Sequence, residues 1–242
     1  MKNIILALMI SLFVLPAVAE KVHLTSLDWP PYAGKTLAEQ GASVAVAQAA
    51  FKAMGHELVV DFFPWSRAVK LASESGSKYV GYFPEYLYES SEFVFSAPMG
   101  QGPLGLVERT DKAINWSALQ DLSKYSIGVV QDYVNTDELD AMIAAGTIKA
   151  QVAPSDELNI QKVAGGRIDA AVIDANVMSY LLANSPKLDK VAGQVQMNSK
   201  LLTNKNLHVA FGNTAEGQKW KAIYDEGLGK VDVAAIMAKF MK

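Results

Sequence analysis

The chain has 242 residues, with 22 basic and 25 acidic side chains and a formal net charge of −3 at pH 7. This mild balance gives no electrostatic footprint for nucleic acid or for an anionic membrane. The sequence contains no cysteine, so the core alone must stabilise the fold. Its three histidines lie far apart, and no phosphate-binding, dinucleotide-binding or serine-hydrolase motif occurs. We therefore expect no metal and no cofactor.

Residues 1–19 have the pattern of a secretory signal peptide. Lys2 supplies a positive start, residues 4–15 are nearly all apolar, and Ala17-Val18-Ala19 has the A-x-A form of a cleavage site. The apolar run is shorter than the roughly 20 residues of a spanning helix. Cleavage of 19 residues would leave 223 of the 242. We expect a freely soluble periplasmic protein without a lipid anchor, because no cysteine follows the cleavage site.

Strand and helix patterns alternate along the rest of the chain in two rounds. The first round predicts extended segments at 22–27, 58–63, 78–83, 94–98 and 102–109, with helices at 43–54 and 66–73. The second round, after Asp111, predicts strands at 125–130, 148–152, 170–174 and 206–212. Its helices are expected to follow the N-cap residues Thr136, Ser155, Asp174, Thr214 and Asp232.

This repeated βαβ pattern predicts an α/β fold with two lobes. We expect residues 20–109 and 205–242 to form lobe 1, and residues 110–204 to form lobe 2. The last strand and helices need a sheet to join, and a return to lobe 1 would make the chain cross between the lobes twice. Two crossings suit a hinge.

Asp174 ends the most informative segment, which runs from Val163 to Asn176. Gly165-Gly166 closes a helix, and a short apolar run then leads into Asp174. Ligands of open α/β sheets bind just beyond the carboxyl ends of strands, where an acidic side chain can face a cation. Asp is also a preferred N-cap. Both roles stay open at this point.

Three further groups lie at the carboxyl ends of predicted strands. Trp29 and Tyr32 belong to a proline-stiffened loop, which either contacts a ligand or covers the core. Trp65 and Arg67 open a helix, and the guanidinium there suits a carboxylate better than it suits the helix dipole. The third group is a loop at Tyr82 and Phe83, which would face Gln131 and Tyr133 of the second lobe across a cleft. The expected ligand-binding residues are Trp29, Tyr32, Trp65, Arg67, Tyr82, Phe83, Gln131, Tyr133 and Asp174.

Taken together, the segments of the chain resemble solute-binding protein family 3, the periplasmic proteins of polar amino-acid transporters. The segments that carry this resemblance are LDWPPYAG, GASVAVAQAAFKAMG, FVFSAP, YSIGVVQDY, GGRIDAAVID and NLHVAFGN. PWSRAVKLA is similar to a W-x-R-A element of one branch of that family. The resemblance implies a two-lobed periplasmic binding protein type II fold, with two β-strand hinge crossings, that closes on a small solute.

One departure from the family concerns its carboxylate clamp. The family's amino-acid binders place an arginine after the third strand, whereas the comparable stretch here, EYLYESSE, has Glu89 at about that position. The resemblance also implies that Asp174 receives the amino group of the ligand. We therefore hypothesise that Asp174 pairs with a cation and that Arg67 takes over the carboxylate.

The function that these patterns favour is the binding of a small polar, amino-acid-like solute for delivery to the permease of an ABC transporter. The protein would work as a monomer and would not be an enzyme. One alternative is a ligand sensor that docks on a membrane receptor. Another is a dehydratase-like enzyme on the same fold, which would need an acid–base pair in the cleft, with Glu85 and Glu89 as the nearest candidates.

Overall fold

The computed structural model describes residues 19–241, so nearly all of the predicted signal peptide lies outside the described residues. Its strands are β1 Lys21–Ser26, β2 Glu57–Phe62, β3 Gly81–Tyr86, β4 Phe93–Phe95, β5 Gly100–Arg109, β6 Ser126–Val130, β7 Lys149–Ala153, β8 Ala170–Asp174, β9 Val195–Met197 and β10 Thr203–Gly212. Its helices are α1 Ala42–Ala53, α2 Trp65–Ser73, α3 Asp137–Ala144, α4 Asp156–Ala164, α5 Ala175–Asn184, α6 Ala215–Leu228 and α7 Val233–Ala238. Three short 3₁₀ helices are η1 Ala38–Gln40, η2 Leu119–Lys124 and η3 Ala192–Gln194. Within this range, every helix is too short or too polar to cross a bilayer.

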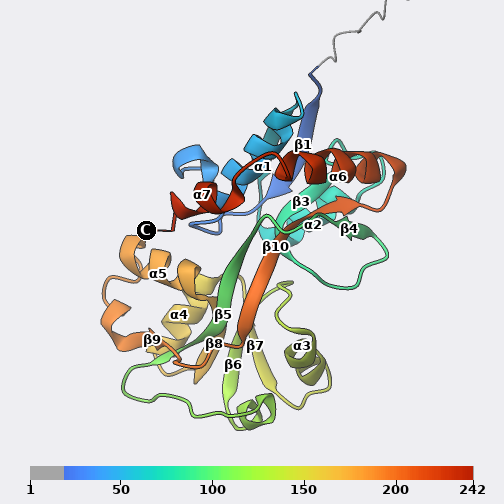
Figure 1. The fold of residues 1–242 in the computed structure, drawn as a ribbon. Helices are drawn as coiled ribbons and strands as arrows, with labels where there is room; N and C mark the ends of the chain where they lie inside the picture. The colour runs from blue at the N-terminus through green and yellow to red at the C-terminus, as the bar shows by residue number, and fades with distance from the viewer. Residues whose placement is uncertain (1–18, 242) are drawn as a thin grey trace, which may run out of the picture.

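The strands form one continuous sheet that passes through two lobes (Figure 1). Its order is β2-β1-β3-β10-β5-β8-β6-β7, with β4 beside β10 and β9 beside β5. In lobe 1, β1 is parallel to β2 and β3. In lobe 2, β6 is parallel to β7 and β8. Each lobe is thus a small parallel α/β unit, as the alternating sequence pattern predicted.

The two lobes are joined by the antiparallel pair β5 and β10, the two longest strands. The first half of β5 pairs with β10, from Gly100 opposite Leu207 to Leu104 opposite Thr203. The second half of β5 pairs with β8 of lobe 2, whereas the end of β10 pairs with β4 of lobe 1. The predicted pair of strand crossings is therefore confirmed. The proposed lobe boundaries fall at the end of β5 and inside β10.

Helix caps and close helix packing account for much of the local structure. The five predicted N-caps, Thr136, Ser155, Asp174, Thr214 and Asp232, all accept a backbone N–H from the first turn of their helix. In lobe 1, α1 packs on α6 with Phe51 against Tyr224, ring centroids 5.1 Å apart. A Cβ on Gly227 would lie 2.2 Å from the carbonyl oxygen of Ala50, so this crossing requires glycine.

The third strand differs from its prediction. We expected a strand at 78–83 followed by a loop at Tyr82-Phe83-Pro84-Glu85, but β3 runs from Gly81 to Tyr86 and all six residues are buried. Pairing with β10 keeps the chain extended, and the register of that pairing shifts between His208 and Ala210, opposite Phe83 and Pro84. A bulge of this kind tolerates a proline inside a sheet. The expectation of a loop at Tyr82 and Phe83 was therefore wrong.

Candidate functional site

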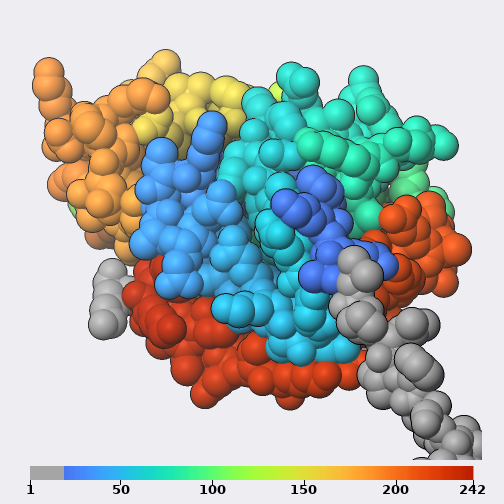
Figure 2. Space-filling model, turned by 90° about the horizontal axis from the view of Figure 1, so that it is seen from above, coloured from blue at the N-terminus to red at the C-terminus, as the bar shows by residue number. Residues whose placement is uncertain are grey.

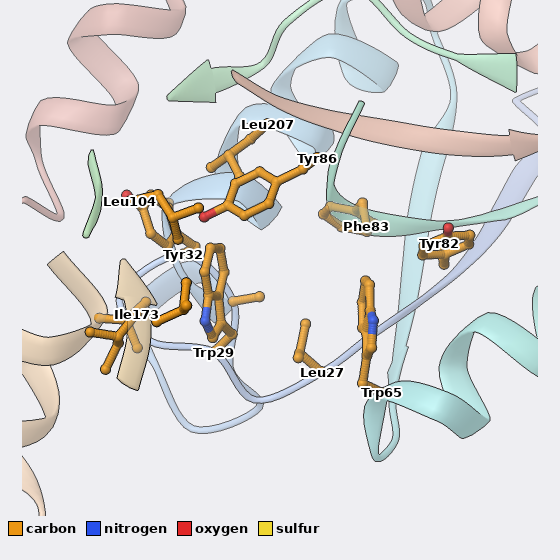
Figure 3. Packing of buried hydrophobic residues seen from close by; sticks show 14 of the residues in the cluster. Leu27, Trp29, Tyr32, Trp65, Tyr82, Phe83, Tyr86, Leu104, Ile173 and Leu207 are labelled. Atoms are coloured by element: carbon orange, nitrogen blue, oxygen red, sulfur yellow. The ribbon is translucent and has the colours of Figure 1, made fainter. Parts of the chain in front are cut away.

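The candidate site lies between the lobes, where β1, β6 and β8 end. Trp29 and Tyr32 lie in the loop after β1, and Trp65 is the first residue of α2. Tyr133 follows β6, and Asp174 ends β8. Figure 3 shows Trp29 and Trp65 on either side of Leu27, with Tyr86 above Trp29. The sequence therefore correctly predicted that these side chains gather at strand ends.

Asp174 both caps α5 and contacts the other lobe. Its Oδ1 accepts the backbone N–H groups of Asn176 at 2.8 Å and Val177 at 3.1 Å. The Tyr32 hydroxyl lies 3.2 Å from both carboxylate oxygens, and the Asn176 amide donates to that hydroxyl at 2.7 Å. The two roles that the sequence left open for Asp174 are thus compatible, since Oδ2 takes no part in the cap. We call the contact between Tyr32, Asp174 and Asn176 the inner contact.

A second contact between the lobes lies at Trp65. Its indole Nε1–H donates to the backbone oxygen of Asp132 at 3.1 Å, and the Ser66 hydroxyl donates to the Asp132 carboxylate. The Trp65 ring also meets Tyr133 edge to face, with centroids 6.0 Å apart. We call this set the outer contact, because Ser66 and Asp132 are exposed. Seen from above, the light-blue segment near α1 adjoins the orange segment of lobe 2 (Figure 2).

One groove and two small cavities share the rings of Trp29 and Tyr133 between the lobes, apart from a further cavity beside the outer contact. The groove has a volume of about 510 Å³, and its lining includes Phe62, Phe63 and Trp65 of lobe 1 with Tyr133, Asp156 and Leu181 of lobe 2. Each small cavity has a volume of about 20 Å³. Both lie against Trp29, Tyr86 and Tyr133. The volume of the groove falls in the range of small-ligand sites, roughly 300–1,000 Å³.

Three buried carboxyl groups surround this region, and burial raises the pKa of each. The pKa of Asp174 rises to about 6, against the opposing effect of the backbone N–H groups that it accepts. The pKa of Asp156 rises to about 7, opposed by a hydrogen bond from Trp29 and increased by the charge of Asp174. The pKa of Glu85 rises to about 8, opposed by the Tyr86 N–H and the Tyr82 hydroxyl. A positive charge brought between the lobes would favour ionisation of these groups.

Other predicted site residues lie away from the groove. Arg67 is exposed, and its guanidinium carbon lies 5.3 Å from the centroid of the Phe63 ring. Gln131 is exposed as well. Phe83 is fully buried, and its backbone oxygen accepts the Ser26 hydroxyl. Tyr82 lies behind Trp65, where it bonds Glu85 and Tyr88 and lines a separate cavity of about 320 Å³.

The sequence did not single out Tyr86 or Asp156 as site residues. The predicted third strand ended at residue 83, three residues before Tyr86. The observed β3 extends to Tyr86, whose side chain is buried and lines both small cavities. Asp156 directly follows the N-cap Ser155, in the first turn of a helix that the sequence predicted. A usable signal was present, because that turn comes directly after a predicted strand, as the Trp65 turn does.

Comparison with known proteins identifies the fold. No family model and no curated relative matches the sequence. A histidine kinase sensor domain with similarity to periplasmic binding proteins superposes with a TM-score of 0.76 at 17% identity, covering 91% of this chain and 95% of that chain. An ancestral arginine-binding protein bound to arginine gives a TM-score of 0.74 at 14% identity, covering 92% of this chain and 98% of that chain. The fold is that of the two-lobed periplasmic binding proteins.

A transport protein shares this fold as well. An amino acid ABC transporter substrate-binding protein from Streptococcus pneumoniae, bound to L-arginine, gives a TM-score of 0.70 at 15% identity, covering 91% of this chain and 92% of that chain. At such identities the likeness is one of fold. It agrees with the resemblance to solute-binding protein family 3 in the sequence, and the ligand of this chain has to be argued from its own residues.

Proposed function

We propose that this chain binds a small polar solute in the groove between its lobes and delivers it to the permease of an ABC transporter. The observation that carries the proposal is that side chains of both lobes line the groove, and that hydrogen bonds cross between the lobes on two sides of it. A solute that touches both lobes stabilises the arrangement in which they meet, which is the thermodynamic basis of closure.

The hinge supports this proposal. Among residues 19–241, only β5 and β10 carry the chain from one lobe to the other, so rotation about these strands leaves most contacts within each lobe unchanged. Gly102 lies in β5 beside the inner contact, where a Cβ would come within 1.9 Å of Asp174 Oδ2 and 2.4 Å of the Tyr32 hydroxyl. The hinge strand is thus shaped to let Tyr32 reach Asp174.

Catalysis is not part of the proposal. Of the two carboxyl groups considered for an acid–base pair, Glu85 is buried and Glu89 is exposed. Both oxygens of Glu85 accept a hydrogen bond: Oε1 accepts the Tyr86 backbone N–H, and Oε2 accepts the Tyr82 hydroxyl. General acid–base catalysis requires the paired groups to reach the same substrate, and this arrangement favours binding.

A thermal-shift screen of the refolded mature chain tests the binding function. The panel contains amino acids, small peptides, amines, carboxylates and sugars, and refolding removes any solute that copurifies. A bound solute stabilises the fold by about 2.7 kcal/mol at a hundredfold excess over its dissociation constant. A panel without a single stabilising compound would contradict the proposal.

Transport and sensing are separated by uptake. The compound that binds is supplied in radiolabelled form to the parent bacterium and to a strain from which the gene is deleted. Loss of uptake in the deletion strain is the expected result. Uptake that is unchanged, together with a lost transcriptional or signalling response to the compound, would favour the sensor instead.

A further inference from the structure

We propose that the groove selects an organic cation, and that a carboxylate on the ligand weakens binding. This inference rests on the proposed function and specifies the ligand class. It departs from the expectation of an amino-acid-like solute held through Arg67.

The first observation is the sign of the charges around the groove. Its ionisable lining residues apart from tyrosine are Asp28, Asp156 and Glu157. Among residues 19–241, no lysine, arginine or histidine lines the groove or either small cavity. Two of the three acids have other partners, since Asp28 accepts the backbone N–H of Lys35 and Glu157 pairs with Lys187. Asp156 is buried and forms no salt bridge within the described residues.

The second observation is the aromatic wall that faces Asp156. Trp29 and Trp65 line both the groove and one small cavity, as does Tyr133. Trp29 stacks on Tyr32 with centroids 4.7 Å apart, and it meets Tyr86 edge to face at 6.1 Å. Neighbouring rings therefore hold the Trp29 ring in place before a ligand binds. Aromatic faces attract ammonium and guanidinium groups, most strongly where water is excluded.

The third observation is a polar group without a partner. The Tyr86 side chain is only 6% exposed and lines both small cavities, and its hydroxyl forms no hydrogen bond with any of the described residues. Buried hydroxyl groups are normally hydrogen-bonded, because an unsatisfied one is destabilising. Tyr86 does not line the groove itself, but Trp29 and Tyr133 line both the groove and these cavities, so an N–H of a ligand in the groove that reached past them would have this oxygen as an acceptor. The hydroxyl is thus a hydrogen-bond acceptor beside the groove that is independent of its acidic residues.

The cations near the cleft do not supply a carboxylate clamp. Lys205 is half-buried, and its ammonium nitrogen lies 5.1 Å from the Tyr86 ring centroid. It lines a different surface cavity together with Asp137, Glu138 and Lys200. Arg67 is engaged with Phe63 and exposed. A ligand carboxylate in the groove would instead meet Asp156, whose ionised form repels it.

Matched pairs of ligands test the proposal by calorimetry on the refolded mature chain. Agmatine is compared with arginine, and cadaverine with lysine, because the members of each pair differ by one carboxylate. Choline is compared with its uncharged carbon isostere, 3,3-dimethylbutan-1-ol. We expect at least one of agmatine, cadaverine and choline to bind at least about tenfold more tightly than its partner. Equal or tighter binding of the amino acids or of the neutral alcohol would overturn the proposal.

The thermal-shift panel distinguishes a failure of the cation proposal from a failure of the proposed binding function. Stabilisation only by neutral or anionic compounds would leave the binding function standing and would overturn the cation proposal. A panel in which nothing binds would overturn both.

A pair of variants assigns the effect to the groove. Asp156→Asn is nearly isosteric and removes the carboxylate that forms no salt bridge, so we expect the affinity for the cation that binds to fall at least about tenfold. Glu216→Gln removes the same charge from the exposed first turn of α6 and should leave the affinity unchanged. Equal effects of the two substitutions would mean that net charge, and not the groove, attracts the ligand.

Discussion

The inner and outer contacts join the same two lobes but differ in their surroundings. The inner contact is buried beside the hinge strand and brings a charged group, Asp174, against the Tyr32 hydroxyl. The outer contact lies at the rim, where Ser66 and Asp132 are exposed to water. Water replaces a lost hydrogen bond at an exposed site, whereas a buried group without its partner is destabilising. We therefore expect the inner contact to control closure and the outer contact to add little.

The largest effect is expected at Gly102. Gly102→Val would place side-chain atoms where Asp174 Oδ2 and the Tyr32 hydroxyl now lie, at 1.9 Å and 2.4 Å from the Cβ position. The inner contact cannot form around them, so we expect ligand affinity to fall by more than about a hundredfold and stability by about 1–3 kcal/mol. Calorimetry and urea unfolding measure the two effects.

Gly193 provides the control for that substitution. A Cβ there meets no atom within 4 Å, so Gly193→Ala should bind and unfold like the parent protein. A Gly102→Val variant that binds normally would show that closure does not need the inner contact.

The next largest effect is expected at Tyr32. Tyr32→Phe keeps the ring stacked on Trp29 but removes the hydroxyl that contacts Asp174 and accepts the Asn176 amide. We expect a loss of about 1–2 kcal/mol in stability and about tenfold in ligand affinity. Thermal unfolding and calorimetry are the measurements. A variant that is destabilised but binds with full affinity would place the role of Tyr32 in folding alone.

The buried carboxyl groups make the stability of the free protein depend on pH. The pKa values of Asp156 and Glu85 rise to about 7 and about 8, so the folded state holds more protons than the unfolded chain up to that range. The free energy of unfolding therefore falls as pH rises from 6.5 to 8.5. His208, whose pKa burial lowers, acts in the opposite sense below pH 6.5. Above pH 6.5 the histidine of the unfolded chain loses its remaining proton, so this contribution is small in the chosen window.

Calorimetric melting over this window tests the sign. We expect the melting temperature to fall by at least about 2 °C, the change that about 1 kcal/mol causes in a domain of this size. The melting temperature of the Asp156→Asn variant should fall less over this window than that of the parent protein. A melting temperature that rises between pH 6.5 and 8.5 would contradict the assignment of these groups.

The smallest effect is expected at the outer contact. Ser66→Ala removes the exposed hydrogen bond to Asp132 but leaves the bond from the Trp65 indole. We expect a change of less than about 0.5 kcal/mol in stability, as for most surface substitutions. Urea unfolding measures it beside Tyr32→Phe. A larger loss for Ser66→Ala than for Tyr32→Phe would reverse the comparison between the two contacts.

The sequence predicted the architecture because its local patterns agree with the global fold. The helix caps, the glycine pair before β8 and the alternation of elements all depend on neighbouring residues. The limit of β3 depends instead on pairing with β10, more than 100 residues away, and on a bulge opposite Pro84. Tyr86 was missed for that reason. Strand limits set by long-range pairing leave little trace in the segment itself.

The positions of the candidate site residues were predicted in part, whereas their roles in binding stay predictions. Asp174, Trp29 and Trp65 follow from their positions at strand ends, where the fold places its ligands. Arg67 also begins a helix after a strand, but its long side chain extends over Phe63 towards solvent. Side-chain direction at a helix start depends on packing that the sequence pattern does not contain.

The central claim is that a solute draws the two lobes together, and a distance across the cleft tests it most directly. The sequence contains no cysteine, so Lys70→Cys and Asp189→Cys, both at exposed positions, introduce unique sites for spin labels on lobe 1 and lobe 2. Pulsed dipolar spectroscopy then gives the distance distribution with and without the compound that stabilises the fold. We predict a broad distribution for the free protein and a single narrow one at saturation, with Gly102→Val remaining broad. A distribution that is unchanged by a bound solute would contradict the account.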